Sequence, residues 1–357
     1  MARIALDAVA HSYEPKALPR RYALERLDMV WEDGGTYALL GPSGCGKTTM
    51  LNIISGLVTP TEGRVMFGAR DVTRLPTPKR NIAQVFQFPV IYASMTVREN
   101  LAFPLVCRRV PRAEIAVRVA EVAELLGLSD KLEKAAVRLT ADEKQLISLG
   151  RGLVRNDVSA ILMDEPLTVI DPQLKFDLRR KLKQVNRSFG LTLVYVTHDQ
   201  NEAMTFADTI VVMSDGRVVQ SGSPQDLFER PQTRYVGYFI GSPAMNFLDC
   251  RPSAGGVELD GGRVALRAGI LPDTPGEYVI GIRPEFASIV DRPMDNALPC
   301  RILDVEDLGN LRIVTAAVGR ARIKVKMARG LPIPAEAGWV VFPPERVCLY
   351  RNGDLVG

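Results

Sequence analysis

The sequence predicts two domains, an α/β domain over residues 1–235 and an all-β domain over residues 236–357. In the first part, short apolar runs alternate with helical patterns, which indicates parallel strands that are buried on both faces. After about residue 236, glycine and proline separate short runs of alternating character, a pattern typical of small barrels and sandwiches. The length of 357 residues fits two or three domains.

The strands and helices of the α/β domain follow one another in a regular order. An apolar run at 37–40 leads into a glycine-rich loop, and residues 47–55 then have a helical pattern. Further apolar runs at 161–163 and 191–196 each end in polar residues, and another run follows at 209–213. Runs this short are typical of strands in an open parallel sheet.

A helical subdomain interrupts this pattern between about residues 88 and 155, where the strand signal disappears. Residues 111–126 predict an amphipathic helix with one apolar face, formed by Ile115, Val119, Val122 and Leu126. In the all-β domain, the alternating runs 278–282 and 322–326 predict strands.

The charge balance and cysteine content describe a cytoplasmic chain. Forty-five basic and 41 acidic residues leave a net charge of +4, which gives no indication of nucleic-acid binding. The basic run at 179–183 is interpreted as a solvated helix face. The five cysteines have no CxxC spacing, so we expect free thiols in a reducing compartment. The N-terminus is a poor signal peptide, and no apolar run approaches the roughly 18 residues that span a bilayer.

The glycine-rich loop at residues 41–49, GPSGCGKTT, matches the pattern G-x-x-x-x-G-K-[ST]. Glycines let successive backbone N–H groups face phosphate oxygens, and the helix N-terminus adds positive potential. Lys47 would bind the β- and γ-phosphates of ATP, and the Thr48 hydroxyl would ligate Mg²⁺. A purely structural glycine turn is the alternative. The nucleotide-binding candidates are Gly41, Pro42, Ser43, Gly44, Cys45, Gly46, Lys47, Thr48 and Thr49.

Two further polar sites follow apolar strands. Asp164 and Glu165 end the run that begins at residue 161, and His198 follows the run at 191–196. Ligands of open α/β sheets bind at the carboxyl ends of strands. Asp164 could therefore hold Mg²⁺, directly or through water, and Glu165 could polarise an attacking water. His198 could contact the γ-phosphate or orient that water. The alternative for the acid pair is a helix N-cap, and His11 has no such context.

Taken together, these segments resemble a known family. GPSGCGKTT, QVFQ, ILMDEP and YVTHDQNEAM are similar, in order and spacing, to the Walker A, Q-loop, Walker B and H-loop of ABC ATPases. Residues 238–248 and the sequence GIRPE at 281–285 resemble the maltose and glycerol-3-phosphate branch of bacterial carbohydrate importers. The resemblance implies a P-loop NTPase core of the ABC type with an inserted helical subdomain, followed by an OB-like regulatory domain.

The resemblance also implies roles for individual residues. Gln87 corresponds to the Q-loop glutamine, which contacts Mg²⁺ and the attacking water. Glu165 corresponds to the catalytic carboxylate and His198 to the switch histidine. Tyr13 corresponds to the aromatic residue that stacks on adenine. Because residues 15–21 look like an insertion, Tyr22 is the runner-up, and core packing is the alternative for both tyrosines.

Partner contacts follow from the same resemblance. The segment from Phe88 to Asn100 corresponds to the surface that contacts a coupling helix of the membrane subunits. Cys45 stands at a loop position where the side chain matters little, so it receives no catalytic role.

The signature motif departs from the family pattern. Where ABC ATPases have L-S-G-G-Q, this chain has Leu-Thr-Ala-Asp-Glu at residues 139–143. In the family, this helix N-terminus completes the site on the Walker A loop of the other subunit. Asp142 and Glu143 would instead bring carboxylates towards the γ-phosphate, and one like-charge pair at roughly 4 Å costs about 4 kcal/mol at an effective dielectric of about 20. The D-loop is also altered, to Thr-Val-Ile-Asp at residues 168–171.

The expected function is that of an ATP-hydrolysing, energy-coupling subunit of a bacterial binding-protein-dependent importer for a carbohydrate, polyol or glycerol-like solute. We expect it at the cytoplasmic face of the inner membrane, with ATP and Mg²⁺ and with permease subunits as partners. A periplasmic or lipid-anchored binding protein would act indirectly, and no nucleic acid is expected. Because of the altered signature, we expect a heterodimer with a paralogous ATPase; a homodimer is the alternative. The alternative function is an ATP-binding regulatory subunit with little hydrolysis; a soluble ABC protein that acts on ribosomes or DNA is disfavoured, because the sequence has neither two fused nucleotide-binding domains nor a strongly basic composition.

Overall fold

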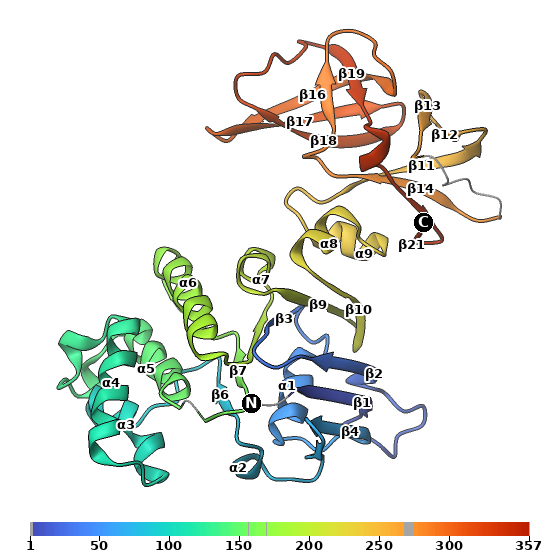
Figure 1. Cartoon of the computed structure of the whole chain (residues 1–357). Coiled ribbons are helices and arrows are strands. Elements are labelled where there is room, and N and C mark those ends of the chain that lie inside the picture. Colours follow the sequence, from blue (N-terminus) through green and yellow to red (C-terminus); the bar gives the residue numbers. More distant parts are fainter. Residues whose placement is uncertain (1–2, 156, 169, 268–274, 357) are drawn as a thin grey trace. The chain divides into compact units, whose positions relative to one another are not determined.

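The chain divides into two compact units in a computed structural model that describes residues 3–155, 157–168, 170–267 and 275–356. The first unit is Met1–Pro224 and the second is Gln225–Gly357. The helices α8 (Pro224–Glu229) and α9 (Arg234–Phe239) therefore belong largely to the second unit. Figure 1 shows the helices and strands of both units in the order of the chain.

The main sheet of the first unit has the strand order β10-β9-β3-β8-β7-β6. All neighbouring strands run parallel except β10, which pairs antiparallel with β9. Every residue of β3 and β8 is buried, as expected for strands that are covered on both faces. The predicted strands at 37–40, 161–163, 191–196 and 209–213 are confirmed. The bounds are β3 Thr36–Leu40, β6 Ala83–Val85, β7 Ile161–Asp164, β8 Leu193–Thr197, β9 Thr209–Ser214 and β10 Arg217–Gly222.

A second, antiparallel sheet in this unit was not expected from the apolar runs. Its order is β2-β1-β4-β5, and its strands are β1 Ile4–His11, β2 Leu24–Trp31, β4 Glu62–Phe67 and β5 Arg70–Asp71. Strand β2 has buried and exposed residues because one face of this sheet is solvated, and a register shift in its pairing with β1 separates the buried Leu24 and Leu27 by three positions. The helix α1 (Lys47–Ser55) has the predicted bounds, and its apolar residues share one core with both sheets.

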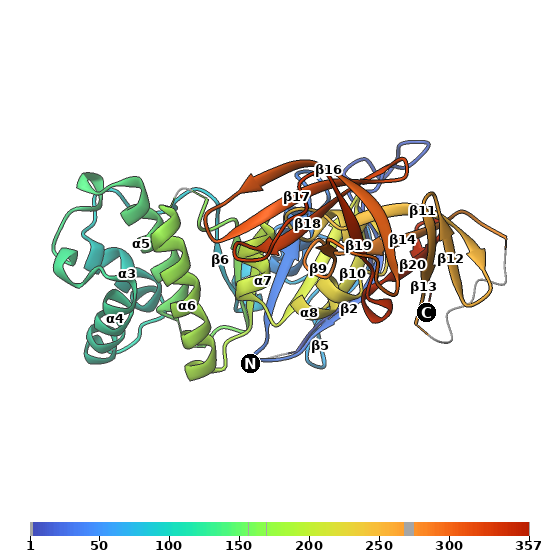
Figure 2. The ribbon, with the colours of Figure 1, turned by 90° about the horizontal axis from the view of Figure 1, so that it is seen from above.

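The inserted helical subdomain is confirmed and contains α3 (Val97–Cys107), α4 (Arg112–Leu126) and α5 (Ala141–Leu153). The predicted apolar face of α4 is buried at all four positions, Ile115, Val119, Val122 and Leu126. Figures 1 and 2 show these three helices grouped beside α6 (Pro172–Phe189), on the side of the unit away from the β1-β2-β4 sheet. The described part of the unit also has two shorter α-helices, α2 (Thr77–Arg80) and α7 (Gln200–Phe206), and two 3-10 helices at Ser129–Lys131 and Ala136–Arg138.

The second unit contains two antiparallel sheets, with orders β13-β12-β11-β14-β20-β21 and β15-β19-β16-β17-β18. The predicted runs at 278–282 and 322–326 are strand β14 and the middle of β18, which confirms an all-β domain. The bounds are β11 Asn246–Ser253, β12 Gly256–Leu259, β13 Gly262–Ala265, β14 Tyr278–Ile282, β15 Ser288–Val290, β16 Ala297–Asp307, β17 Leu311–Val318, β18 Ala321–Ala328, β19 Ala337–Val341, β20 Cys348–Arg351 and β21 Asp354–Leu355.

Arg283, in the GIRPE segment after β14, connects α8 and α9 to the strands of the second unit by hydrogen bonds. Its guanidinium is buried and donates hydrogen bonds to the carbonyls of Phe228 at 2.8 Å and Gly237 at 2.9 Å. Burial lowers the pKa of Arg283 to about 10. The motif that resembles an importer family thus includes an arginine that satisfies helix-end carbonyls.

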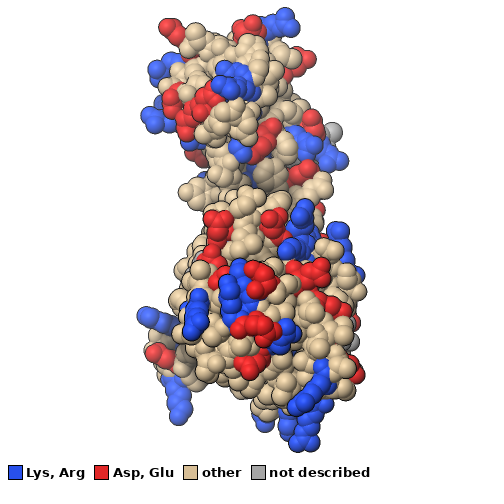
Figure 3. Space-filling view, turned by 90° about the vertical axis from the view of Figure 1, so that its left-hand side faces the viewer, with Lys and Arg blue, Asp and Glu red and all other residues tan. Residues whose placement is uncertain are grey.

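The charged surface corrects one expectation. On the face shown in Figure 3, Lys and Arg are interspersed with Asp and Glu. The basic run 179–183 is only partly solvated, because Arg180 is exposed whereas Arg179 is largely buried against an acid of α7. In the described part of the chain, no helix is long and apolar enough to cross a membrane.

Candidate nucleotide-binding and catalytic site

The glycine-rich loop connects the end of β3 to the start of α1. Gly46 is the N-cap of α1 at φ 101°, and no side chain caps the helix. A Cβ atom on Gly46 would lie 2.6 Å from the Ala23 carbonyl oxygen, and one on Gly41 would lie 2.3 Å from that of Met213. Only glycine fits these two positions, and the N–H groups of the first helical turn are left without a side-chain acceptor.

Lys47 lies across this loop. Its ammonium group donates hydrogen bonds of 2.8 Å to the carbonyls of Gly41 and Pro42. Cys45 is buried beside it, with Sγ 3.7 Å from Nζ. A buried cation, a glycine loop and an uncapped helix N-terminus together form a site that fits an anionic phosphate chain.

Thr48 and Asp164 meet at the edge of the loop. The Thr48 hydroxyl donates to Asp164 Oδ1 at 3.4 Å. Burial raises the pKa of the Asp164 carboxyl, and the Thr48 hydrogen bond and the Lys47 charge oppose that rise. No group of three or more His, Cys, Asp or Glu that could hold a metal occurs among the described residues. A hydroxyl and one carboxylate suit Mg²⁺, which is usually bound by one or two carboxylates together with substrate phosphates.

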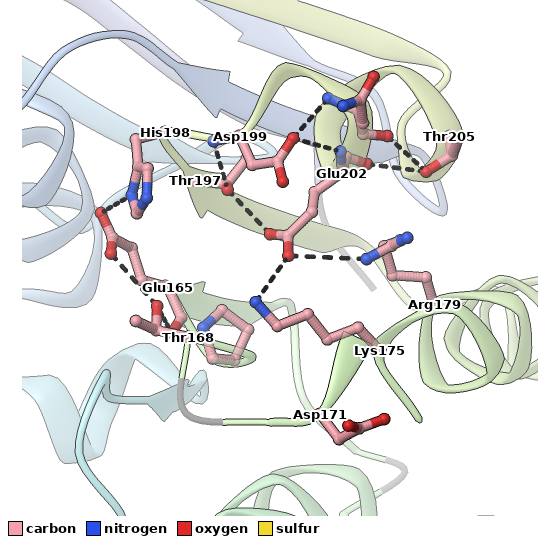
Figure 4. Close-up of polar contacts among 12 residues, drawn as sticks. Glu165, Thr168, Asp171, Lys175, Arg179, Thr197, His198, Asp199, Glu202 and Thr205 are labelled. Atoms are coloured by element: carbon pink, nitrogen blue, oxygen red, sulfur yellow. Dashed lines mark hydrogen bonds and ion pairs between the residues drawn. The ribbon is translucent and has the colours of Figure 1, made fainter. Parts of the chain in front are cut away.

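Glu165 contacts both of the other predicted catalytic residues, and Figure 4 shows its contact with His198. Its Oε1 atom is 3.0 Å from Nδ1 of His198, and its Oε2 atom accepts a hydrogen bond of 3.4 Å from Gln87 Nε2. The backbone N–H of Glu165 donates to the Val196 carbonyl at 3.0 Å, and its φ of 44° turns the chain away from β7. The structure thus brings together all three residues predicted to be catalytic.

The Glu165–His198 contact orients the imidazole. An ionised carboxylate only accepts hydrogen bonds, so this contact assigns the proton to Nδ1 and leaves Nε2 for another partner. His198 is 57% exposed, whereas the Glu165 side chain is 18% exposed. The histidine therefore stands at the surface of the site, and the carboxylate lies behind it.

The two candidate adenine-stacking tyrosines have different surroundings. The Tyr13 hydroxyl lies 3.2 Å from Thr49 Oγ1 in α1, and the residue is 62% exposed. Its edge packs on His11, whose pKa is lowered by burial. Tyr22 instead donates to Glu62 at 2.9 Å and accepts from Arg20. Only Tyr13 contacts the helix that follows the phosphate loop.

The altered signature has an unexpected geometry. Thr140 is the N-cap of α5, and its hydroxyl accepts from the Glu143 N–H at 3.3 Å. The Glu143 carboxylate turns back and accepts from the Thr140 N–H at 2.9 Å, and it also pairs with Lys131 at 3.0 Å. The Thr140 N–H and the Lys131 ammonium lower the pKa of Glu143. Glu143 is therefore held within its own helix end, which the motif comparison alone did not reveal.

Two further contacts were not predicted from the sequence. The Thr168 hydroxyl lies 3.3 Å from Glu165 Oε2, and it donates to the Glu165 carbonyl at 3.1 Å. Glu202 on α7 is buried beside the His198 turn. Thr168 carries a weak sequence signal, a hydroxyl three residues after the acid, but Val169 of the same D-loop lies outside the described residues. Nothing in the local pattern around Glu202 indicates its partners.

The geometry defines a class of protein before any comparison. A phosphate loop on an uncapped helix after β3, a histidine after the neighbouring strand β8 and an acid pair at the end of β7 are the parts of a P-loop ATPase. The family model of the ABC transporter matches residues 24–168, and the model of the MalK OB fold domain matches residues 241–286.

Curated relatives extend this similarity over the chain. A trehalose/maltose import ATP-binding protein from Thermococcus litoralis is 42% identical over 319 residues, covering 83% of this chain and 84% of the relative. A sulfoquinovosyl glycerol transport ATP-binding protein from Agrobacterium fabrum is 34% identical over 356 residues, covering 98% of both chains. An sn-glycerol-3-phosphate import ATP-binding protein from Chromohalobacter salexigens is 43% identical over 286 residues, covering 80% and 75%.

A solved structure supports the fold. The structure of cbiO1 from Clostridium perfringens, part of an ABC transporter complex, has a TM-score of 0.58 at 24% identity, covering 64% of this chain and 90% of the other. The chain belongs to the ATP-binding subunits of ABC transporters, the branch with a MalK-type OB domain, and is an ABC-type ATPase.

Proposed function

We propose that this chain is the ATP-hydrolysing, energy-coupling subunit of a binding-protein-dependent importer, working at the cytoplasmic face of the inner membrane. The observation that carries the proposal is Glu165, which lies 3.0 Å from His198 and 3.4 Å from Gln87 beside the phosphate loop. The relatives are named for trehalose, maltose, sn-glycerol-3-phosphate and sulfoquinovosyl glycerol. A carbohydrate, polyol or glycerol-like solute is the class that these names share.

ATP binding is assigned to the loop and to Tyr13. Lys47 exchanges its two carbonyl acceptors for the β- and γ-phosphates, and the N–H groups at the start of α1 donate to the same anion. Tyr13 is chosen over Tyr22 as the adenine-stacking residue because it contacts Thr49 of α1, whereas Tyr22 is engaged with Glu62. An exposed ring can stack on a base with little rearrangement.

Thr48, Gln87 and Asp164 would hold Mg²⁺, which neutralises charge on the phosphate oxygens when bound. Asp164 is suited to this role because its buried carboxylate lies beside the Thr48 hydroxyl. Gln87 lies near Asp164, because its side-chain amide donates to Glu165, the next residue in the chain.

Glu165 is the general base that accepts a proton from the attacking water. Its position behind His198 keeps the carboxylate at the floor of the site. His198 donates from Nδ1 to one oxygen of Glu165, and Gln87 donates to the other, so the two residues orient the attacking water through this carboxylate. General-base catalysis of this kind contributes about 10²–10⁴-fold to a rate.

Coupling to the membrane is assigned to the segment that follows Gln87. Apolar side chains are exposed there in close succession, with Phe88 70% exposed and Val90 and Tyr92 also exposed. Exposed apolar side chains grouped in this way mark a protein contact. The partner that fits is a coupling helix of an integral-membrane permease subunit, and the solute-binding protein acts through that permease.

The second ATPase of the complex is proposed to be a paralogue rather than a second copy. In the family, the signature helix presents a hydroxyl and free N–H groups to the partner's γ-phosphate. Here the Thr140 N–H donates to the Glu143 carboxylate, and the Glu143 N–H donates to the Thr140 hydroxyl, so two backbone donors of this helix end already have acceptors. An internal carboxylate thus occupies the helix N-terminus that an incoming phosphate would need. One site of the dimer would hydrolyse ATP, and the site opposite would bind ATP and hydrolyse it poorly.

The test compares the chain purified alone with the chain purified together with its neighbouring paralogue. We expect low ATP turnover alone and strong turnover together, and Glu165→Gln in this chain should abolish most turnover of the pair. Vigorous, cooperative hydrolysis by the lone chain would favour the homodimer. If Glu165→Gln leaves the pair fully active, the chain is instead the regulatory subunit, a function that the engaged signature helix also favours.

A further inference from the structure

The acid Glu202 lies behind the His198 turn and takes no part in the site described so far. Its side chain is only 8% exposed. One carboxylate oxygen, Oε2, accepts hydrogen bonds of 2.9 Å from both the Tyr195 hydroxyl and the Thr197 hydroxyl. A buried carboxylate is costly unless it is paired and hydrogen-bonded, so this acid has a defined set of partners.

The other carboxylate oxygen faces α6. Glu202 Oε1 lies 3.4 Å from Lys175 Nζ and 3.6 Å from Arg179 Nη1, and Figure 4 shows both cations reaching the acid from one side of that helix. These two side chains are 23% and 12% exposed. Ion pairs that are this well shielded from solvent are screened less by salt than surface pairs are.

Through Thr197, the same acid fixes the backbone on both sides of His198. Because the Thr197 hydroxyl donates to Glu202, its oxygen is left to accept the Asp199 N–H at 3.0 Å. Asp199 in turn accepts the backbone N–H of Glu202 at 3.3 Å. Both residues that flank His198 are therefore tied to Glu202, while the imidazole itself stays exposed.

The helix that Glu202 holds begins where the catalytic segment ends. Asp171 is the N-cap of α6, and its carboxylate accepts the Gln173 N–H at 2.9 Å. The segment from Glu165 to Asp171 thus runs directly into the helix that carries Lys175. The Glu165 and His198 segments contact each other through these two side chains. A second connection runs from the His198 turn through Glu202 to α6.

We propose that Glu202 is a positioning residue for ATP hydrolysis, which holds the His198 turn against the start of α6 and so keeps the imidazole within hydrogen-bonding distance of Glu165. The proposal rests on the proposed role of Glu165 and His198. Glu202 itself touches neither nucleotide nor water. A residue of this kind acts on kcat, because a displacement of about 1 Å at the reacting groups can cost on the order of 100-fold in rate.

The first experiment observes His198 without any turnover. The chain has only two histidines, so histidine-selective isotope labelling gives two imidazole signals in NMR spectra, and a His11→Gln variant assigns them. We expect Glu202→Gln and Lys175→Met to shift the His198 signal in the nucleotide-free chain. Lys183→Met is the matched control, because it breaks an ion pair from the same helix to Asp208. An unchanged His198 signal in both test variants would overturn the proposal.

The second experiment measures ATP turnover and ATP affinity in the chain assembled with its partner ATPase and permease. Glu202→Gln and Thr197→Val are expected to lower kcat by about 10–100-fold, while the ATP affinity of the folded protein stays near that of the parent. Thr197→Ser keeps the hydroxyl and should restore kcat. An equal loss of ATP affinity, or no rescue by serine, would overturn the positioning role.

The two readouts separate this inference from the function on which it rests. If Glu165→Gln leaves turnover intact, the proposed function fails, and the His198 signal alone decides whether Glu202 positions the turn. If Glu165→Gln abolishes turnover but Glu202→Gln leaves kcat unchanged, the proposed function stands and the positioning role is wrong. Lys175→Met keeps the question answerable if the Glu202 variant does not fold.

Discussion

Two helix N-termini of the first unit show how a few residues open or close an anion site. At α1 the N-cap is Gly46, which has no side chain, and the first-turn N–H groups have no side-chain acceptor. At α5 the N-cap is Thr140, and Glu143 completes a reciprocal capping box with it. Both helices have the same dipole direction relative to their first turn. The side chains therefore leave the start of α1 open to a phosphate, whereas at the start of α5 the N–H groups of Thr140 and Glu143 have internal acceptors.

The difference also changes why the signature is unfavourable for hydrolysis. On the motif alone, the expected defect is repulsion between two carboxylates and the γ-phosphate. In the structure the Glu143 carboxylate is paired with Lys131 and turned onto its own helix end. The defect is then a smaller repulsion than the motif suggests, because the N–H groups of Thr140 and Glu143 have internal acceptors and Asp142 remains as an acid in the first turn.

The largest expected effect is on ATP turnover, at the catalytic site beside the start of α1. Glu165→Gln keeps the size of the side chain but removes the base, so turnover by the assembled ATPase pair should fall by about 10²–10⁴-fold. ATP should still bind, because Lys47 and the α1 N-terminus are untouched. Turnover is measured by phosphate release, and ATP binding by equilibrium dialysis. A simultaneous loss of binding would mean that Glu165 holds the loop rather than the water.

Restoring the family signature at the start of α5 should have the next largest effect on ATP turnover. The combined change Thr140→Ser, Ala141→Gly, Asp142→Gly and Glu143→Gln removes both acids and the carboxylate half of the capping box. Donors aimed at developing charge are worth about 10²–10³-fold in other enzymes, so turnover by the lone chain should rise by roughly tenfold or more. Adding Glu165→Gln is the control and should cancel the rise. No rise would indicate that the altered signature does not limit the lone chain.

The sequence predicted the surroundings of α1 better than the contacts at the start of α5, for a physical reason. The strand at 37–40, the helix at 47–55 and the apolar face of α4 depend on local periodicity, and all three are confirmed. The meeting of Glu165 and His198 followed because neighbouring parallel strands end at one edge of the sheet, whereas Gln87 was expected there only from the family resemblance.

What could not be predicted depends on partners distant in the sequence. The antiparallel sheet pairs β1 with β4 across more than fifty residues, and apolar runs do not encode such pairing. Glu143 finds Lys131 through the packing of the segment before α5, so its charge is neutralised by a residue outside the motif. Arg179 looked like part of a solvated basic run, but it faces the buried Glu202. In each case tertiary contact, not residue type, determines the state of the charge.

A smaller effect is expected on stability. Thr140→Ala removes the hydroxyl that accepts the Glu143 N–H, and loss of an N-cap of this kind costs about 1 kcal/mol. For a domain of this size that corresponds to a decrease of roughly 2–4 °C in melting temperature. Turnover of the assembled pair should change little, because this signature faces the poorly hydrolysing site. Thr140→Ser should melt near the parent, and a large loss of turnover in Thr140→Ala would argue for the homodimer.

The smallest expected effect is on the pH dependence of the melting temperature, through Glu143 at the start of α5. The pKa of Glu143 is lowered by the Thr140 N–H and by Lys131. An acid with a lowered folded-state pKa stabilises the folded chain at pH values above its unfolded pKa, and this contribution is lost as pH falls through the folded-state pKa. The parent should therefore melt slightly higher than Glu143→Gln at pH 7, by at most a few degrees, and the difference should shrink towards pH 3. Melting curves of both proteins across this range measure it. A difference in melting temperature that stays constant with pH would show that the charge of the Glu143 carboxylate does not stabilise the start of α5.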